Sequence, residues 1–308
     1  MPELKASDSI KPIDSDESVA LIDGARVVSY DEFTRRTSAL ARELVGAGVG
    51  PEVAVAVQID RSVEMTVAIH AIVLAGGHYV PLGSDMPAER IDYILETSGA
   101  RLTLVGPATA ESDGTLRVDC SGPVPEVAPF TPTDRLSPLR GDSPAYTLFT
   151  SGSTGRPKGV TVSHDAIVNR LTWMRDLYQL TGSDVFLQKT PITFDVSVWE
   201  LFLPAAIGAP LVIVEPGRHG DPGHLADLIV EHSVTAVHFV PSMLAAFADV
   251  LGDDLGRLES LRRVFTSGEA LTAAVAYPVL HHLAAAELHN LYGPTEAAVD
   301  VTAHHVTI

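Results

Sequence analysis

A ten-residue segment rich in glycine, hydroxyl groups and positive charge lies near the middle of the sequence. It reads Thr150-Ser151-Gly152-Ser153-Thr154-Gly155-Arg156-Pro157-Lys158-Gly159 and separates two strand-like apolar runs. Glycines let a backbone approach a ligand closely, hydroxyls offer donors, and Lys158 brings positive charge, so the segment favours a polyphosphate cradle. A flexible solvent loop is the alternative. The segment is neither a Walker loop, since Gly159 follows Lys158, nor a Gly-x-Ser-x-Gly nucleophile elbow.

Two further places carry side chains that could do chemistry. Asp195 ends an apolar stretch, and a partly buried carboxylate needs a cationic partner or hydrogen bonds to remain charged. The alternative for Asp195 is an ordinary helix N-cap. Tyr292-Gly293-Pro294 follows a strand-like run and predicts a turn, after which Glu296 can serve as a charge at a helix N-terminus.

The elements that must position these groups alternate between helices and strands. Ser29 and Glu32 form a capping box, so the first predicted helix begins there and runs to the glycines at 46, 48 and 50. This rhythm predicts an α/β fold built from two βαβ-type subdomains with mainly parallel sheets. Further helices are predicted at 62–74, 87–97, 164–180, 196–207, 225–232, 243–251 and 272–285, and strands at 53–57, 102–105, 146–149, 160–162, 185–187, 211–214, 236–240, 263–265 and 287–291.

The same pattern divides the chain into four parts. Residues 1–18 mix Lys, Asp and Glu without an apolar stretch and predict a frayed lead-in. Residues 19–106 form the first predicted α/β subdomain, and residues 145–308 form the second. Between them, residues 107–144 contain seven prolines, which predicts an irregular connection.

Composition excludes several classes of protein. The 308 residues include 21 Lys and Arg against 39 Asp and Glu, and the resulting net charge of −18 argues against a nucleic-acid partner. No uninterrupted apolar stretch reaches the ~20 residues that a membrane span needs. Cys120 is the only cysteine, which excludes an internal disulfide and fits a reduced cytoplasmic setting. Its place in the Pro-rich connection does not suggest a nucleophile. The 12 histidines lack the spacing of metal ligands.

Four motifs in order resemble those of the adenylate-forming superfamily, in particular the amino-acid adenylation domains of nonribosomal peptide synthetases. The 150–159 segment is similar to the family's phosphate loop. The other three motifs are Leu74-Ala75-Gly76-Gly77-His78-Tyr79-Val80-Pro81-Leu82, Phe194-Asp195-Val196-Ser197-Val198-Trp199-Glu200 and Asn290-Leu291-Tyr292-Gly293-Pro294-Thr295-Glu296. The resemblance implies the large N-terminal subdomain of that fold. It also implies that the sequence stops at Ile308 before the barrel and the C-terminal subdomain, whose absence would impair adenylation by this chain alone.

The resemblance implies where ATP and magnesium bind. The phosphates would lie along Thr150 to Lys158, including Ser151, Gly152, Ser153, Thr154 and Gly155, and Glu296 would bind Mg²⁺. Thr150, Lys158 and Glu296 would be the catalytic residues, because attack of a carboxylate on the α-phosphate requires charge to be neutralised. The remaining nucleotide-binding residues would be Gly268, Glu269, Asn290, Tyr292, Gly293 and Thr295.

The resemblance also assigns a pocket for the substrate side chain. Asp195 would bind the α-ammonium of an amino acid, and the bulky Trp199 and Phe265 would leave room for only a short side chain. The pocket positions are Asp195, Val196, Trp199, His238, Phe265, Ser267, Leu291, Val299 and Asp300. Its polar members favour a hydroxyl-bearing substrate, and the set resembles that of serine-activating domains. Threonine, cysteine, glycine or an α-substituted serine remain open, and core packing is the alternative role for each apolar position.

The function implied is formation of seryl-AMP, followed by transfer to the phosphopantetheine thiol of a carrier protein. Whether an MbtH-like helper protein takes part is left open. An acyl- or aryl-CoA ligase of the same superfamily, which would not need Asp195, is one alternative. A catalytically silent ligand-binding or interaction module is the other.

Overall fold

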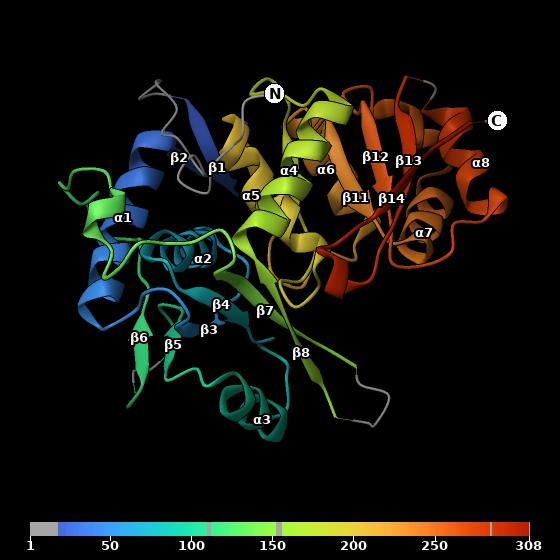
Figure 1. The fold of residues 1–308 in the computed structure, drawn as a ribbon. Helices are drawn as coiled ribbons and strands as arrows, with labels where there is room; N and C mark the ends of the chain where they lie inside the picture. Colours follow the sequence, from blue (N-terminus) through green and yellow to red (C-terminus); the bar gives the residue numbers. More distant parts are fainter. Residues whose placement is uncertain (1–17, 110–111, 152–155, 284, 308) are drawn as a thin grey trace.

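Two β-sheets lie side by side in the computed structural model, which describes residues 18–109, 112–151, 156–283 and 285–307 (Figure 1). The predicted lead-in at 1–18 therefore falls, except for Ser18, outside the described residues. Strand pairing is mainly parallel, as predicted, with antiparallel pairs at the β2, β8 and β14 edges. The fold is thus α/β with mixed sheets.

The larger sheet has eight strands and the smaller has six. In spatial order the larger sheet contains β14 (Thr302–Val306), β13 (Glu287–Tyr292), β12 (Arg263–Thr266), β11 (Ala236–Phe239), β9 (Phe186–Gln188), β10 (Leu211–Ile213), β1 (Val19–Asp23) and β2 (Arg26–Ser29). The smaller sheet contains β6 (Thr115–Arg117), β5 (Leu102–Val105), β3 (Ala54–Gln58), β4 (His78–Pro81), β7 (Pro144–Thr150) and β8 (Lys158–Ser163).

Helices cover both faces of each sheet. The shared central core contains side chains of α1 (Tyr30–Gly46), α2 (Val63–Ala75), α4 (His164–Tyr178) and α5 (Val196–Ile207). The outer face of the smaller sheet packs on α3 (Ala88–Ser98), and that of the larger sheet on α6 (Pro222–Glu231), α7 (Pro241–Leu251) and α8 (Ala273–His282). No helix among the described residues is long and apolar enough to cross a membrane.

Local sequence explains where several of these helices begin and end. Ser29 caps α1 by accepting a hydrogen bond from the backbone N–H of Glu32, as predicted, and Ser62 caps α2 in the same way. Gly76 ends α2 in a left-handed conformation, which costs glycine little because it has no Cβ.

The sheets exchange strands across the predicted subdomain boundaries. The hairpin β1–β2 belongs to the larger sheet, because β1 pairs with β10, whereas β7 and β8 extend the smaller sheet through β4. The predicted irregular connection also contains β6, which pairs in parallel with β5. These pairings correct the division into consecutive units, because a strand joins whichever sheet edge offers unpaired backbone groups, whatever its place in the sequence.

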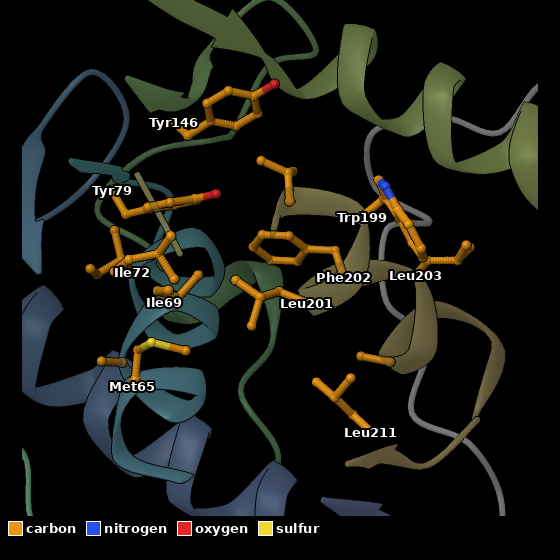
Figure 2. Packing of buried hydrophobic residues seen from close by; sticks show 14 of the residues in the cluster. Met65, Ile69, Ile72, Tyr79, Tyr146, Trp199, Leu201, Phe202, Leu203 and Leu211 are labelled. Atoms are coloured by element: carbon orange, nitrogen blue, oxygen red, sulfur yellow. The ribbon is translucent and has the colours of Figure 1, made fainter. Parts of the chain in front are cut away.

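Aromatic side chains join the two halves of the central core (Figure 2). Tyr79 and Tyr146, on neighbouring strands of the smaller sheet, lie with ring centroids 5.8 Å apart. Phe202 of α5 faces Tyr79 at 6.2 Å, and all three rings are buried. The two tyrosine hydroxyls have no hydrogen-bond partner in the described structure. This contact packs α5, which Asp195 precedes, against the smaller sheet.

A buried histidine in this core is expected to make stability depend on pH. His70 lies between Phe33 and Phe202, and burial lowers its pKa to about 4. The unfolded chain binds this proton below about pH 6.5, whereas the folded chain does not, so stability falls as pH drops from there toward 4. Between pH 7 and pH 5, the wild-type protein should lose about 2 kcal/mol more unfolding free energy than the His70→Leu variant. Urea denaturation at both pH values measures this difference. His304→Gln, at an exposed position, is the matched control, and an equal pH dependence in all three proteins would contradict the prediction.

Candidate active site

The carboxyl ends of the parallel strands β9, β11, β12 and β13 meet at one edge of the larger sheet, where open α/β sheets bind ligands (Figure 1). His238, Phe265 and His289 are directly opposite one another in register and therefore share a face. Leu291 lies two residues beyond His289, so it shares this face too. The strands thus bring together pocket residues that are far apart in sequence.

Aromatic rings form the wall above this face. Trp199 of α5 meets Phe265 edge-on at 5.5 Å, and Tyr178 of α4 meets it at 4.8 Å. Trp199 and Phe265 are fully buried. The other apolar pocket positions, Val196, Leu291 and Val299, are buried as well. All five predicted apolar positions also belong to the central core, so core packing and pocket lining are compatible roles.

A neutral polar pair lies beside this wall. His238 Nε2 is 2.9 Å from the Ser267 hydroxyl, and the ring of His238 stands edge-on to Trp199 at 6.3 Å. Burial holds the pKa of His238 well below its usual value, so the imidazole is neutral at pH 7. Its Nδ1 has no partner among the described residues. The pair can therefore exchange hydrogen bonds with a small hydroxyl group.

Asp195 lies at the start of α5, where its carboxylate does not cap the helix. Instead, Oδ2 accepts a hydrogen bond of 2.7 Å from the hydroxyl of Thr295. Asp195 thus occupies the N-cap position of α5 without a side-chain capping bond, and its bond to Thr295 joins the third motif to the fourth. Burial raises the pKa of Asp195, an effect that the Thr295 bond opposes and the nearby Asp300 carboxylate adds to. A cation placed here would relieve that cost.

Asp300, predicted as a polar member of the pocket, forms an ion pair with Arg170. Arg170 Nη2 lies 2.6 Å from Asp300 Oδ2, and both side chains are buried. Sequence reasoning missed Arg170. Its only sequence signal is a charge within the otherwise amphipathic helix α4, where an arginine is usually solvated.

The predicted nucleotide-binding residues are divided between the two sheets. Thr150 and Lys158 are paired across β7 and β8, and Ser151 is exposed, whereas Gly152, Ser153, Thr154 and Gly155 lie outside the described residues. Asn290 Oδ1 accepts a hydrogen bond of 3.1 Å from Thr266. Thr266 therefore orients this amide.

The remaining residues of this group differ in how freely they face solvent. Tyr292 is 67% exposed, so its ring is open to solvent. Gly268 has a φ of +86°, and the Glu269 beside it is held by the backbone N–H and hydroxyl of Ser242 at the start of α7. Glu269 is thus engaged within the protein rather than directed at Tyr292.

Glu296 lies in a cleft of about 680 Å³ between α4, β8 and the 3-10 turn Thr295–Ala297. Its carboxylate is exposed, which suits a hard cation shared with phosphate oxygens, because Mg²⁺ is often held by one or two carboxylates plus substrate phosphates. No group of three or more His, Cys, Asp and Glu side chains fit to hold a metal occurs within the described ranges. Any magnesium here would depend on the bound nucleotide.

Gly293 is required by close backbone packing within the fourth motif. A Cβ at this position would lie 2.5 Å from Asp300 Cα and 2.7 Å from the carbonyl oxygen of Val299. We expect Gly293→Ala to destabilise the protein by about 1 to 3 kcal/mol, since backbone atoms cannot rotate aside. Thermal unfolding would measure this. Gly46→Ala is the control, because nothing lies within 4 Å of its added Cβ and alanine favours the helix, and equal melting temperatures for both variants would contradict the prediction.

Buried charges that the sequence did not indicate support the loop before Asp195. Glu200 is fully buried and accepts hydrogen bonds from the backbone N–H groups of Lys189 and Thr190, at 3.2 and 3.0 Å, and from the Thr190 hydroxyl at 2.6 Å. Burial lowers the pKa of Lys189 to about 8, and its ammonium lies 4.7 Å from the centre of the Phe239 ring. Glu200 stands in the third motif, but no periodicity marks it as buried.

The fold and this site define a known class. Residues 14–307 match the family model described as AMP-binding enzyme, so the chain belongs to the AMP-binding enzyme family. It is 47% identical over 284 residues to phosphinothricin tripeptide synthetase PhsB of Streptomyces viridochromogenes, covering 91% of this chain and 24% of the relative. It is 46% identical over 297 residues to enterobactin synthase component F of Escherichia coli K12, covering 93% of this chain and 22% of the relative. The chain thus spans about a quarter of the length of these relatives.

Solved structures of related proteins have a similar fold. The nonribosomal peptide synthetase FmoA3, in its form bound to α-methyl-L-serine-AMP, matches with a TM-score of 0.84 and 27% identity, covering 95% of this chain and 33% of that chain. The N-terminal subdomain of Klebsiella oxytoca NpsA, in complex with 3-hydroxyanthranilyl-AMSN, matches with a TM-score of 0.80 and 27% identity, covering 94% and 72%. The predicted fold of the large adenylate-forming subdomain is confirmed.

Proposed function

We propose that this chain carries the amino-acid and nucleotide sites of an adenylation domain of a nonribosomal peptide synthetase, with L-serine as substrate. The observation that carries the proposal is the partly buried Asp195 carboxylate, which the Thr295 hydroxyl joins to the nucleotide motif. The buried pair of His238 and Ser267 supplies polar groups for the substrate side chain. The α-ammonium of an amino acid supplies the cation that this carboxylate lacks. Relatives named as peptide synthetases support this choice of class.

The reaction joins the substrate carboxylate to the α-phosphate of ATP. A carboxylate oxygen forms a bond to the α-phosphorus, the bond from that phosphorus to the bridging oxygen of the β-phosphate breaks, and pyrophosphate leaves. Thr150, Lys158 and the loop between them would hold the phosphates, and Glu296 would hold Mg²⁺, so that developing negative charge is neutralised. Tyr292 and Asn290 would bind the adenine, while Gly268, Glu269 and Gly293 shape the backbone around it.

The pocket supports a short side chain with a hydroxyl group. Trp199 and Phe265 fill the space that a longer side chain would occupy. An alanyl side chain would leave the polar groups of His238, Ser267 and Asp300 without a ligand partner, at a cost of about 1 to 3 kcal/mol for each group left unsatisfied. The relative bound to α-methyl-L-serine-AMP is consistent with a substrate of this kind.

An aryl- or acyl-activating ligase is the second candidate, because NpsA is similar in structure and its title names an aryl-adenylate analogue. An aryl acid has no ammonium group, so it would leave the partly buried Asp195 without a cation. The carboxylate therefore favours an amino acid.

Calorimetric titration with non-hydrolysable adenylate analogues tests the proposal directly. We expect the seryl analogue to bind at least about tenfold more tightly than the alanyl, threonyl and deaminated seryl analogues. Indifference to the amine would move the assignment to an acyl or aryl ligase. Absence of binding by a demonstrably folded chain would contradict the ligand sites themselves.

The product would pass to the phosphopantetheine thiol of a carrier protein, as the class of the relatives suggests. The thiolate would attack the acyl carbon, and AMP would leave. Mass spectrometry of a carrier protein incubated with the complete synthetase, serine and ATP tests this step, and a carrier that gains no seryl mass would contradict it. Repeating the assay with and without an MbtH-like protein tests whether such a helper takes part.

A further inference from the structure

Arg170 makes one polar contact within the described part of the chain. Its Nη2 donates to Asp300 Oδ2 at 2.6 Å, whereas Nε and Nη1 have no partner there. The guanidinium lies 4.8 Å from the centre of the Trp173 ring, and only 4% of the side chain is exposed. A buried ion pair with unsatisfied donors is seldom the most stable solution for a protein interior, because desolvation offsets much of the attraction. The pair therefore calls for a functional explanation.

The ion pair holds a strained turn that carries two pocket residues. Ala298 and Val299 both have positive φ values, of 59° and 80°, and a β-branched residue rarely adopts this conformation. Strain of this kind persists where surrounding contacts impose it, often at ligand sites. Arg170 supplies such a contact by tying Asp300 to α4. The turn is thereby fixed in the position that presents Val299 and Asp300.

The site contains two neighbouring carboxylates, and within the described ranges only Asp300 has a cationic partner. The Asp300 carboxylate raises the pKa of Asp195, which places the two groups within electrostatic reach. Arg170 neutralises Asp300, so Asp195 is the carboxylate left for a substrate ammonium. Because Arg170 engages Oδ2 alone, Oδ1 of Asp300 keeps its lone pairs without a hydrogen-bond partner among the described residues.

We propose that Arg170 is a positioning residue that sets the side-chain selectivity of the pocket. By binding Oδ2 of Asp300, it directs the substrate ammonium to Asp195 and leaves Oδ1 of Asp300 to accept the substrate hydroxyl. The inference rests on the proposed function. It adds a residue from α4 that touches no substrate atom and acts through Asp300.

Titration of the chain with the seryl analogue, the alanyl analogue and AMP tests this role. Arg170→Met keeps the length of the side chain and removes the charge. We expect its preference for the seryl over the alanyl analogue to fall by at least about fivefold, with alanyl and AMP affinities within about twofold of wild type. Arg175→Met, on the same helix at a partly exposed ion pair with Asp176, is the matched control and should change none of the three affinities.

The possible outcomes distinguish a role of Arg170 in substrate selectivity from a merely structural role. An unchanged preference in Arg170→Met, or an equal loss of seryl and alanyl affinity, would overturn the proposal, because a merely structural role lowers both affinities together. If Arg170→Met does not fold, Arg170→Lys carries the test, since it keeps the charge without the planar fork. A fall in its preference of at least about threefold with unchanged alanyl affinity supports the proposal, and an unchanged preference overturns it. A wild-type chain that binds both analogues equally would overturn the serine assignment itself, and this inference with it.

Discussion

Replacing Asp195 with alanine is expected to weaken binding of the seryl-adenylate analogue by at least about 30-fold while leaving AMP affinity within about twofold. The carboxylate is the only described acidic group at the start of α5, and it lies beside a second acid that Arg170 already neutralises. Removing it leaves the substrate ammonium desolvated without a counterion. Calorimetric titration of both ligands measures the effect.

The Asp195→Asn variant removes the negative charge of the side chain but keeps its shape. The amide oxygen can still accept the Thr295 hydrogen bond, so the start of α5 should be preserved. We expect the asparagine variant to lose seryl affinity and to bind the deaminated analogue at least as well as wild type, because no uncompensated carboxylate is then buried. Equal loss of seryl and AMP binding in both variants would contradict the role assigned to Asp195.

The pH dependence of this interaction has a definite sign. Burial raises the pKa of Asp195, and below that pKa the neutral carboxyl group no longer attracts an ammonium. Affinity for the seryl analogue should therefore fall as the solution is acidified in wild type. The Asp195→Asn variant should not show this dependence.

Replacing Glu200 with alanine is expected to lower the free energy of unfolding by about 3 to 5 kcal/mol, a large part of the 5 to 15 kcal/mol typical of a folded domain. The substitution deprives three donors on Lys189 and Thr190 of their acceptor and leaves the buried Lys189 ammonium without its nearby anion. Urea denaturation monitored by circular dichroism measures the loss.

Two further variants test whether the loss comes from buried charge. Glu231→Ala, at an exposed position on α6, should change stability by no more than about 0.5 kcal/mol. Lys189→Met combined with Glu200→Gln should be less destabilised than the sum of the two single variants, because removing both charges leaves neither uncompensated. Strict additivity would contradict a direct interaction between them.

Local patterns in the sequence were sufficient to predict the α-helices and most of the strands at the centres of the two sheets. The N-cap at Ser29 and the stop at Gly76 depend on neighbouring residues alone, so the start of α1 and the end of α2 could be predicted. The short strands β1, β2, β4, β6 and β14 were missed, because their residues acquire strand geometry only through a partner supplied by another part of the chain. A run of three to five residues is too short for hydrophobic alternation to indicate a strand.

The sequence by itself determined the order of the motifs and therefore the class of chemistry. The side chains of Asp195, Lys158 and Glu296 suit their predicted roles because of the charge they carry. That charge can be read from the sequence without coordinates. Tertiary structure decided which side chains these charged groups contact. The Thr295 bond to Asp195 spans 100 residues of sequence and the Arg170 bond to Asp300 spans 130. Such pairs form only where the crossing of α4 and α5 over the larger sheet brings distant side chains within about 3 Å, and no local pattern encodes that crossing.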